Sequence, residues 1–322
     1  MRSQQEEPPS RSEADLLRPH RSLYGLRACS LGNLTEKRSL GWNMIQYLIV
    51  TLFGLVIGSF LTVVVHRLPI MLERAWHAEA GHICGARAAH CIHTVKGRAY
   101  NLWQPRSHCP ACGHTLTLLE NIPLISYLRL RGRCAACGAP IPVRYLLIEV
   151  LSAASAAAAL WRFSASGPAL AAYGLIAALL ALAWIDLKTH LLPDALTAPL
   201  LWSGLIVNLE ARFAPLADAV IGALAGYLSL WLLAWLFRLV RNKEGMGHGD
   251  FKLLAALGAW LGWTALPSIA LLASASGGLF GMAARARGTL EKNQPLPFGP
   301  FLAVAGALML FWTPPWMPWT RL

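Results

Sequence analysis

The chain has 322 residues, of which 56% are hydrophobic and only 14% are charged. A soluble domain carries nearer a quarter charged residues, so this composition argues against a soluble globular protein and predicts a polytopic membrane protein. The formal net charge of +12 does not require nucleic acid as a partner. Basic loops that set membrane topology and contact the anionic surface of a lipid bilayer account for it.

The first segment, residues 1–43, is polar and carries seven lysines and arginines. It lacks the apolar core and the cleavage site of a signal peptide. We therefore expect a disordered tail or a segment that is not translated. Met44 directly begins the first apolar run, at 44–66, so translation starting at Met44 is one interpretation and Met1 is the other.

Residues 67–144 form a polar insert that contains two CxxCG motifs separated by 21 residues. Two thiolates from each tight turn can bind one ion, and the glycine after each pair permits a left-handed backbone that directs amide hydrogens at sulfur. We expect the four sulfurs to hold a structural Zn²⁺ ion. Redox-active CxxC pairs and structural disulfides are the competing interpretations, and reducing cytoplasm argues against disulfides. The expected metal ligands are Cys109, Cys112, Cys134 and Cys137.

The remainder, residues 145–322, contains seven further apolar runs, each close to the ~20 residues that cross a bilayer. The runs are continuously apolar and lack the alternation of a membrane barrel, so they predict helices. The expected fold is an all-α polytopic membrane protein with about eight transmembrane helices and a small zinc-knuckle insert. The eight runs are 44–66, 145–163, 168–187, 191–210, 217–240, 250–266, 267–284 and 296–318.

Basic residues predict the orientation of these helices. The insert carries ten lysines and arginines, and the loops near 188, 238–252 and 285–292 carry more. Positively charged loops remain on the cytoplasmic side, so we expect the insert and these loops to be cytoplasmic.

Two aspartates, Asp186 and Asp250, each lie where an apolar run meets a short polar loop, with two further apolar runs between them. An even number of crossings returns the chain to the side it left, so both carboxyl groups should face the cytoplasm at about the same depth. Ionisable groups at this position indicate a functional site. Gly247 and Gly249 would let backbone or substrate approach Asp250 closely. The alternatives are an interfacial carboxylate for Asp186 and a helix-capping acid for Asp250.

Two neighbouring carboxyl groups do not both ionise readily. The ionised one can activate water as a general base while the protonated one polarises a carbonyl group, which is the chemistry of peptide hydrolysis without a covalent intermediate. We find no His-Glu-x-x-His motif on an apolar run and no serine or cysteine with an evident base. Asp194 follows Pro193 and is expected to cap the next helix.

Two other classes of function fit the same features. In a transporter, membrane aspartates would relay protons or bind cations, although we see no inverted repeat between the halves of the chain. In a non-catalytic assembly factor, the zinc insert would recruit a secretion ATPase.

The order and spacing of several motifs make the chain, from Met44 onward, resemble the bacterial prepilin peptidases, or type IV leader peptidases. Thr62 stands where that family usually has asparagine, and Leu146 where proline is common. The matching stretches are Gly58-Ser59-Phe60-Leu61, His66-Arg67-Leu68-Pro69, the two cysteine motifs, Glu120-Asn121-Ile122-Pro123, Leu130-Arg131-Gly132-Arg133, Asp186 to Asp194, Gly247 to Lys252 and Pro297-Phe298-Gly299-Pro300.

This resemblance implies that Asp186 and Asp250 are the catalytic pair of a GxGD aspartic protease. Such enzymes cleave the basic leader from type IV prepilins and type II secretion pseudopilins at the cytoplasmic face of the bacterial inner membrane. They then N-methylate the new amino terminus with S-adenosylmethionine, an activity linked to the zinc-binding domain. The sequence leaves open the residues that bind the methyl donor and the oligomeric state.

Overall fold

The computed structural model describes residues 25–84, 100–104, 106–109, 111–117, 127, 129–242, 246–288 and 296–312. Within 25–84, side chains are described from Met44 to Ala80. The matching stretch Glu120-Asn121-Ile122-Pro123 lies outside the described residues. The chain divides into two compact units, Met1–Leu48 and Ile49–Leu322, and the candidate site lies entirely within the second.

The first helix, α1, runs from Gly25 to Cys84 and includes Pro69. It therefore begins inside the segment expected to be a disordered tail and continues past residue 66, where the first transmembrane helix is expected to end. No proline interrupts residues 25–43, and good helix formers follow Pro69, so one missing amide hydrogen does not end the helix.

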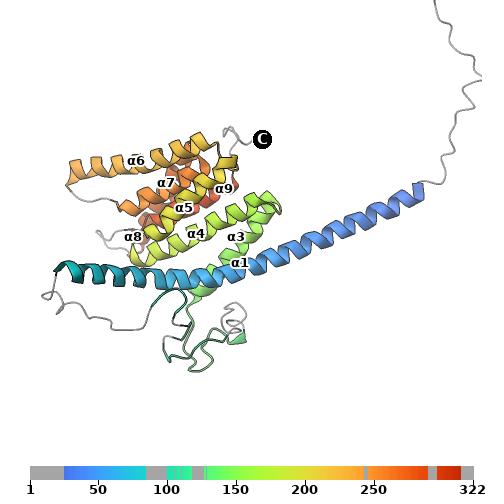
Figure 1. The fold of residues 1–322 in the computed structure, drawn as a ribbon, viewed down its shortest axis with the longest axis horizontal. Helices are drawn as coiled ribbons and strands as arrows, with labels where there is room; N and C mark the ends of the chain where they lie inside the picture. The colour runs from blue at the N-terminus through green and yellow to red at the C-terminus, as the bar shows by residue number, and fades with distance from the viewer. Residues whose placement is uncertain are drawn as a thin grey trace, which may run out of the picture. The chain divides into compact units, whose positions relative to one another are not determined.

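Helices make up nearly all of the remaining regular structure (Figure 1). Apart from two isolated bridges in the insert, the described residues form no β-structure, which agrees with the expected all-α class. Each predicted apolar run after the insert corresponds to one helix, although the bounds differ by several residues in places, and residues 313–318 of the last run lie outside the described residues. These helices are α3 (Val143–Phe163), α4 (Gly167–Thr189), α5 (Asp194–Val207), α6 (Leu216–Arg241), α7 (His248–Leu261), α8 (Leu266–Ala286) and α9 (Gly299–Phe311), with short 3₁₀ turns η2 (Asn208–Glu210) and η3 (Trp263–Ala265).

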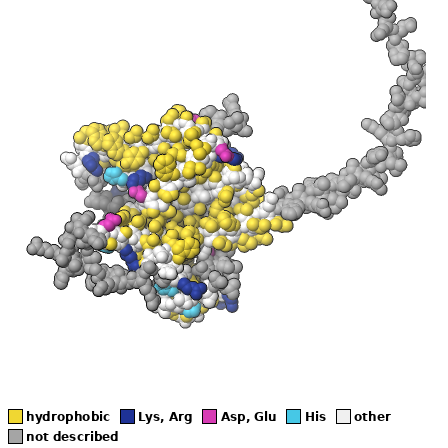
Figure 2. All heavy atoms as spheres, in the orientation of Figure 1, with side chains coloured by type: hydrophobic (Ala, Val, Ile, Leu, Met, Phe, Trp, Pro, Cys, Tyr) yellow, Lys and Arg dark blue, Asp and Glu magenta, His cyan; other side chains and the backbone are white. Residues whose placement is uncertain are grey.

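Five segments of the described chain are long and apolar enough to cross a membrane, which indicates a multi-pass membrane protein. Apolar side chains cover most of the visible face of these helices (Figure 2). By contrast, α5 and α7 have 14 residues each and α9 has 13, so each is only about 20 Å long. Eight complete crossings therefore remain a prediction. The five segments are Met44–Ala80, Val143–Phe163, Gly167–Thr189, Leu216–Arg241 and Trp263–Ala286.

Helix α7 is the most buried helix of the described chain. Except for Lys252, every residue from Asp250 to Leu261 is buried, because α5, α6 and α9 pack around it. A Cβ atom at Gly222 of α6 would lie 2.4 Å from the carbonyl oxygen of Gly258, so glycine permits the close approach of α6 and α7. This agrees with the close helix contact that small residues permit in membrane proteins.

A buried asparagine fixes the far end of α7. The Asn208 side chain donates hydrogen bonds to the carbonyl oxygens of Ala259 and Trp260, both at 2.9 Å. Its Oδ1 accepts hydrogen bonds from the backbone amides of Phe213 and Ala214. All hydrogen-bonding capacity of this buried amide is thus used, and α7 is anchored at the end opposite to Asp250.

Close backbone contact also joins α1 to α3. A Cβ atom at Gly58 would lie 2.7 Å from the Cα atom of Glu149. One turn earlier in α1, the carbonyl oxygen of Gly54 accepts a hydrogen bond of 2.7 Å from the hydroxyl of Ser152 in α3. Thr62, one of the two departures from the family pattern, is buried, and its hydroxyl donates a hydrogen bond to the carbonyl oxygen of Ser59 at 2.7 Å, so the local packing accommodates it.

Candidate active site

Asp186 lies in the last turn of α4 and is only 5% exposed. Its Oδ2 accepts a hydrogen bond of 3.0 Å from the backbone amide of Gly299, the first residue of α9. Helix α4 ends because His190 adopts the left-handed conformation, with φ at 54°, and donates its amide to the carbonyl oxygen of Asp186. The start of α9 therefore holds the side chain of Asp186, and the end of α4 holds its backbone.

Asp250 lies in the first turn of α7 and is 8% exposed. Its amide bonds to the carbonyl oxygen of Gly247, which caps the helix in an extended conformation. A Cβ atom at Gly249 would lie 2.7 Å from Cβ of Leu192, so this position needs glycine for close packing. A Cβ atom at Gly247 would meet nothing within 4 Å, so contacts among the described residues do not require glycine there.

Leu192 connects the two aspartate-bearing segments. It belongs to the loop between α4 and α5 and packs against Gly249. Its Cδ1 would also lie 3.3 Å from a Cβ atom at Gly299. The structure thus brings both predicted aspartates to one site, at the end of α4 and the start of α7, with α5 and α6 between them in the chain.

An ion pair joins the start of α5, which follows the loop of Leu192, to the first turns of α7. Lys252 Nζ contacts Oδ1 and Oδ2 of Asp194 at 2.6 and 2.7 Å. Asp194 is the first residue of α5, Pro193 occupies the capping position, and no side chain caps this helix. The expectation that Asp194 caps α5 is therefore wrong. Both carboxylate oxygens of Asp194 instead bind Lys252, which is distant in the chain but adjacent in space.

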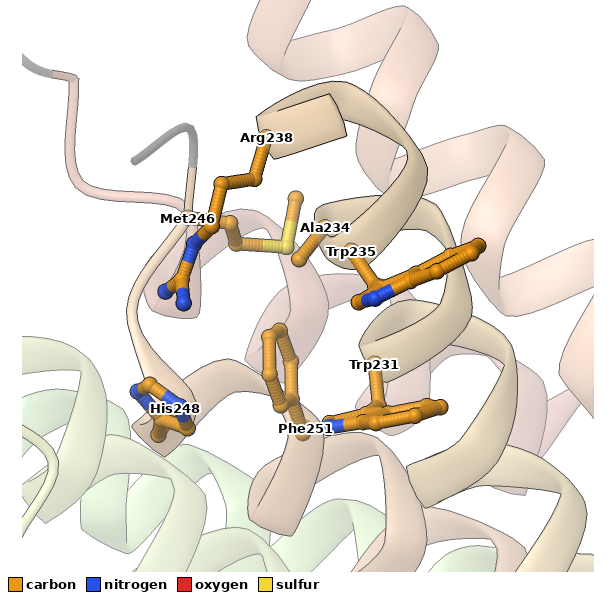
Figure 3. A pocket seen from close by; sticks show the side chains of 7 residues that line it. All are labelled: Trp231, Ala234, Trp235, Arg238, Met246, His248 and Phe251. Atoms are coloured by element: carbon orange, nitrogen blue, oxygen red, sulfur yellow. The ribbon is translucent and has the colours of Figure 1, made fainter. Parts of the chain in front are cut away.

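A cavity of about 140 Å³ adjoins the segment that carries Asp250 (Figure 3). Helix α6 supplies two indole rings to one wall, and the loop before α7 supplies a methionine to the other. The exposed polar groups at the cavity are one arginine and one histidine. The lining residues are Trp231, Ala234, Trp235, Arg238, Met246, His248 and Phe251.

The four predicted cysteines form a second site, in the insert. Their sulfur atoms all lie within 4.8 Å of one another, with 3.9 Å between Cys109 and Cys137 and 4.0 Å between Cys112 and Cys134. A tetrahedron of sulfurs about 2.3 Å from a metal has edges of about 3.8 Å, whereas a disulfide requires about 2.05 Å. All four are free thiols. The geometry therefore fits one four-sulfur metal site and not two disulfides.

The two cysteine turns have the same backbone structure. The glycine after each pair, Gly113 and Gly138, has a positive φ of 72° and 70°, as the motif predicts. Backbone amides of Cys112 and Ala111 donate to the sulfur of Cys109 and lower the pKa of that thiol to about 7. Amides of the equivalent residues in the second turn lower the pKa of Cys134. Hydrogen bonds that favour the thiolate favour the form that binds metal.

Comparison with known proteins identifies the family of the chain. Residues 52–163 match the bacterial peptidase A24 N-terminal domain, and residues 173–282 match the type IV leader peptidase family. No solved structure shows detectable similarity to the chain.

Several relatives carry the name prepilin leader peptidase/N-methyltransferase. One from Burkholderia pseudomallei strain 1026b is 55% identical over 288 residues, which cover 89% of this chain and 92% of the relative. One from Aeromonas salmonicida strain A449 is 51% identical over 272 residues, covering 84% and 92%. One from Pseudomonas aeruginosa is 50% identical over 261 residues, covering 81% and 88%. With these matches and with its paired aspartates and cysteine turns, the chain belongs to the type IV leader peptidase family.

Proposed function

We propose that the chain is a membrane aspartic endopeptidase that cleaves the leader from type IV prepilins and pseudopilins and then N-methylates the new amino terminus. The observation that carries this proposal is the convergence of Asp186 and Asp250 on one site in a chain of this family. Relatives named for both activities support it.

In the proposed cleavage, the two carboxyl groups share one proton. The ionised carboxylate removes a proton from water, whose oxygen attacks the scissile carbonyl carbon, while the protonated carboxyl donates its proton to the carbonyl oxygen. The tetrahedral intermediate then collapses. The peptide C–N bond breaks, the leaving amine takes a proton from the carboxyl group that accepted one from water, and a hydroxyl group of the intermediate returns its proton to the other carboxylate.

The location of the site supports a substrate that is itself anchored in the membrane. A prepilin carries a basic leader ahead of an apolar helix, and docking that helix among the spans would place the leader junction at the aspartates. Anchoring makes the attack effectively intramolecular. We place the site on the cytoplasmic face of the inner membrane, because the basic insert and loops favour that side.

We propose that the four cysteines hold one Zn²⁺ ion. The sulfur separations and the thiolate-favouring amides support this assignment. Four protein ligands leave no open position for substrate, so the ion would be structural and would stabilise the insert.

S-adenosylmethionine would supply the methyl group for the second reaction. The new amino group takes this methyl group and loses one proton. The described residues contain no strand followed by a glycine-rich loop.

A single experiment tests both reactions. Purified protein is incubated with a synthetic prepilin and isotopically labelled S-adenosylmethionine. The masses of the leader and of the mature fragment are then measured by mass spectrometry. We expect an unmodified leader and a mature fragment that carries one labelled methyl group. An intact prepilin, or proton-coupled uptake by protein in vesicles, would instead indicate an assembly factor or a transporter.

Replacement of Gly299 by alanine should impair cleavage without unfolding the protein. The added Cβ would lie 2.7 Å from Oδ2 of Asp186, so the carboxyl group must move away from the position that the Gly299 amide now fixes. We expect kcat to fall about 10- to 100-fold, since a displacement near 1 Å is enough for such a loss. Gly278→Ala is the matched control, because a Cβ atom at Gly278 meets nothing within 4 Å. Equal kcat for the two variants would contradict this prediction.

A further inference from the structure

Residues 100–104, which precede the cysteine turns in the insert, are held against α1. Nη1 of Arg67 in α1 donates hydrogen bonds to the carbonyl oxygens of Asn101 and Leu102, at 3.0 and 3.4 Å. The same guanidinium group lies over the ring of Tyr100, 5.7 Å from its centroid. Leu102 also packs against the hydrophobic core of the helices. We call residues 100–104 the contact segment, because these interactions fix it to a membrane-spanning helix.

The indole of Trp103, in the contact segment, reaches the apolar part of α1. Its ring centroid lies 6.2 Å from that of Phe60. Arg67 is the first charged residue after Met44, and Phe60 precedes it by seven residues. Phe60 is therefore about 10 Å further into the apolar run along the helix axis. Trp103 thus belongs to the polar insert in sequence but lies at the depth of a spanning segment.

The backbone of the contact segment suits an apolar environment. Oδ1 of Asn101 accepts hydrogen bonds from the amides of Trp103 and Gln104, at 2.9 and 2.6 Å. The amide of Asn101 donates to the carbonyl oxygen of Gln104 at 2.9 Å. Backbone polar groups at membrane depth must find their partners within the protein, because hydrocarbon offers none. The turn itself and Arg67 supply these partners.

The two stacked rings are open on their outer side. Trp103 is 78% exposed and Phe60 is 40% exposed. Phe60 belongs to a segment long and apolar enough to cross a membrane, so its exposed side faces lipid. Tryptophan, with an apolar ring and one N–H donor, collects where lipid headgroups meet acyl chains. We propose that the contact segment is a membrane-interface anchor of the insert, with the indole of Trp103 placed among lipid molecules.

The anchor limits how far the cysteine turns can lie from the membrane. Cys109 follows Trp103 by six residues, which is at most about 20 Å of extended chain. Under the proposed function, cleavage releases the new amino terminus at this membrane surface. The anchor would then hold the insert close to the amino group that is to be methylated. Only this consequence rests on the proposed function, whereas the anchor rests on the contacts of Trp103.

Photo-crosslinking in lipid vesicles tests the anchor. The full-length variant Trp103→p-benzoylphenylalanine is placed in vesicles of phosphatidylethanolamine and phosphatidylglycerol without prepilin and is irradiated. We expect the chain to gain the mass of one phospholipid, as the same replacement of Val56 in the spanning segment should. Thr115, an exposed residue of the insert, is the matched control. The yield of lipid adduct at position 103 should exceed that at position 115 at least about fivefold.

A second measurement uses only natural residues. Trp103→Phe keeps an aromatic ring, and the fluorescence that it removes is the emission of Trp103 alone. This emission should be quenched by brominated acyl chains and protected from the water-soluble quencher acrylamide. Neither experiment uses an activity, so failure of the anchor is distinguishable from failure of the proposed function.

Three outcomes would overturn the anchor. In the first, position 103 yields no more lipid adduct than position 115. In the second, the adduct at position 103 is a second copy of the chain, or added prepilin replaces the lipid adduct with a peptide adduct, so that the exposed indole is a protein contact. In the third, acrylamide quenches the emission of Trp103 and brominated lipid does not.

Discussion

Asp186→Asn and Asp250→Asn should each reduce prepilin cleavage by at least about 10³-fold while the protein stays folded. Asparagine preserves the size of the side chain and can still accept the hydrogen bond from the Gly299 amide, but it can neither take a proton from water nor share one with its partner. Because the two groups act as a unit, the double variant should be no worse than either single variant. Initial rates of leader release from a synthetic prepilin measure all three.

Methyl transfer provides the control for this experiment. A mature pilin peptide with a free amino terminus should still be methylated by both asparagine variants, which shows that the fold and the donor site survive. The assignment of the pair would be refuted if either variant retained more than about a tenth of wild-type cleavage, or if the effects of the two substitutions multiplied as independent losses do.

The positions of the aspartates along the chain predict much of this site. Alternation of apolar runs and loops places Asp186 and Asp250 at the same end of the helices, because two helices separate them. The cysteine spacing likewise predicts a cluster of four sulfurs and the left-handed glycine after each pair. These features depend on the local geometry of the cysteine turns and on the number of helices between the two aspartates, and both can be read from the sequence.

The contacts that hold the site depend on tertiary packing and could not be predicted. Gly299 is far from Asp186 in the chain, and the helix start that donates its amide is identified only once α9 lies against α4. Nothing in the sequence marks Leu192 as part of the site, because its contact with Gly249 depends on the packing of the loop against α7. The motif Pro297-Phe298-Gly299-Pro300 is the one signal that marks this segment.

Helix α7 shows why the number of crossings was not predictable from composition. Its residues are as apolar as those of a spanning helix, yet it has 14 residues and is buried by protein neighbours. Protein interior and lipid both exclude polar side chains, so an apolar run of this length is compatible with either environment.

Cys112→Ser should remove the metal from the protein. A zinc ion in a small peptide fold contributes about 10–16 kcal/mol, and an insert with little core of its own depends on that contribution. We expect the zinc content to fall from one ion per chain to nearly none, and methyl transfer to decrease more than cleavage does. Elemental analysis of the purified protein and the two activity assays measure these effects.

Thiol accessibility distinguishes a metal site from the competing redox pairs. Four sulfurs on one ion should all resist alkylation until a strong chelator is added, and then all should react together, because every ligand is released at once. Redox pairs would react independently of the chelator, and each pair would require reductant. Cys29→Ser, outside both cysteine turns, is the control and should keep its zinc. Retention of zinc by Cys112→Ser, or thiols that respond to reductant alone, would refute the four-sulfur assignment, since each of the four sulfurs contributes to a closed tetrahedral site.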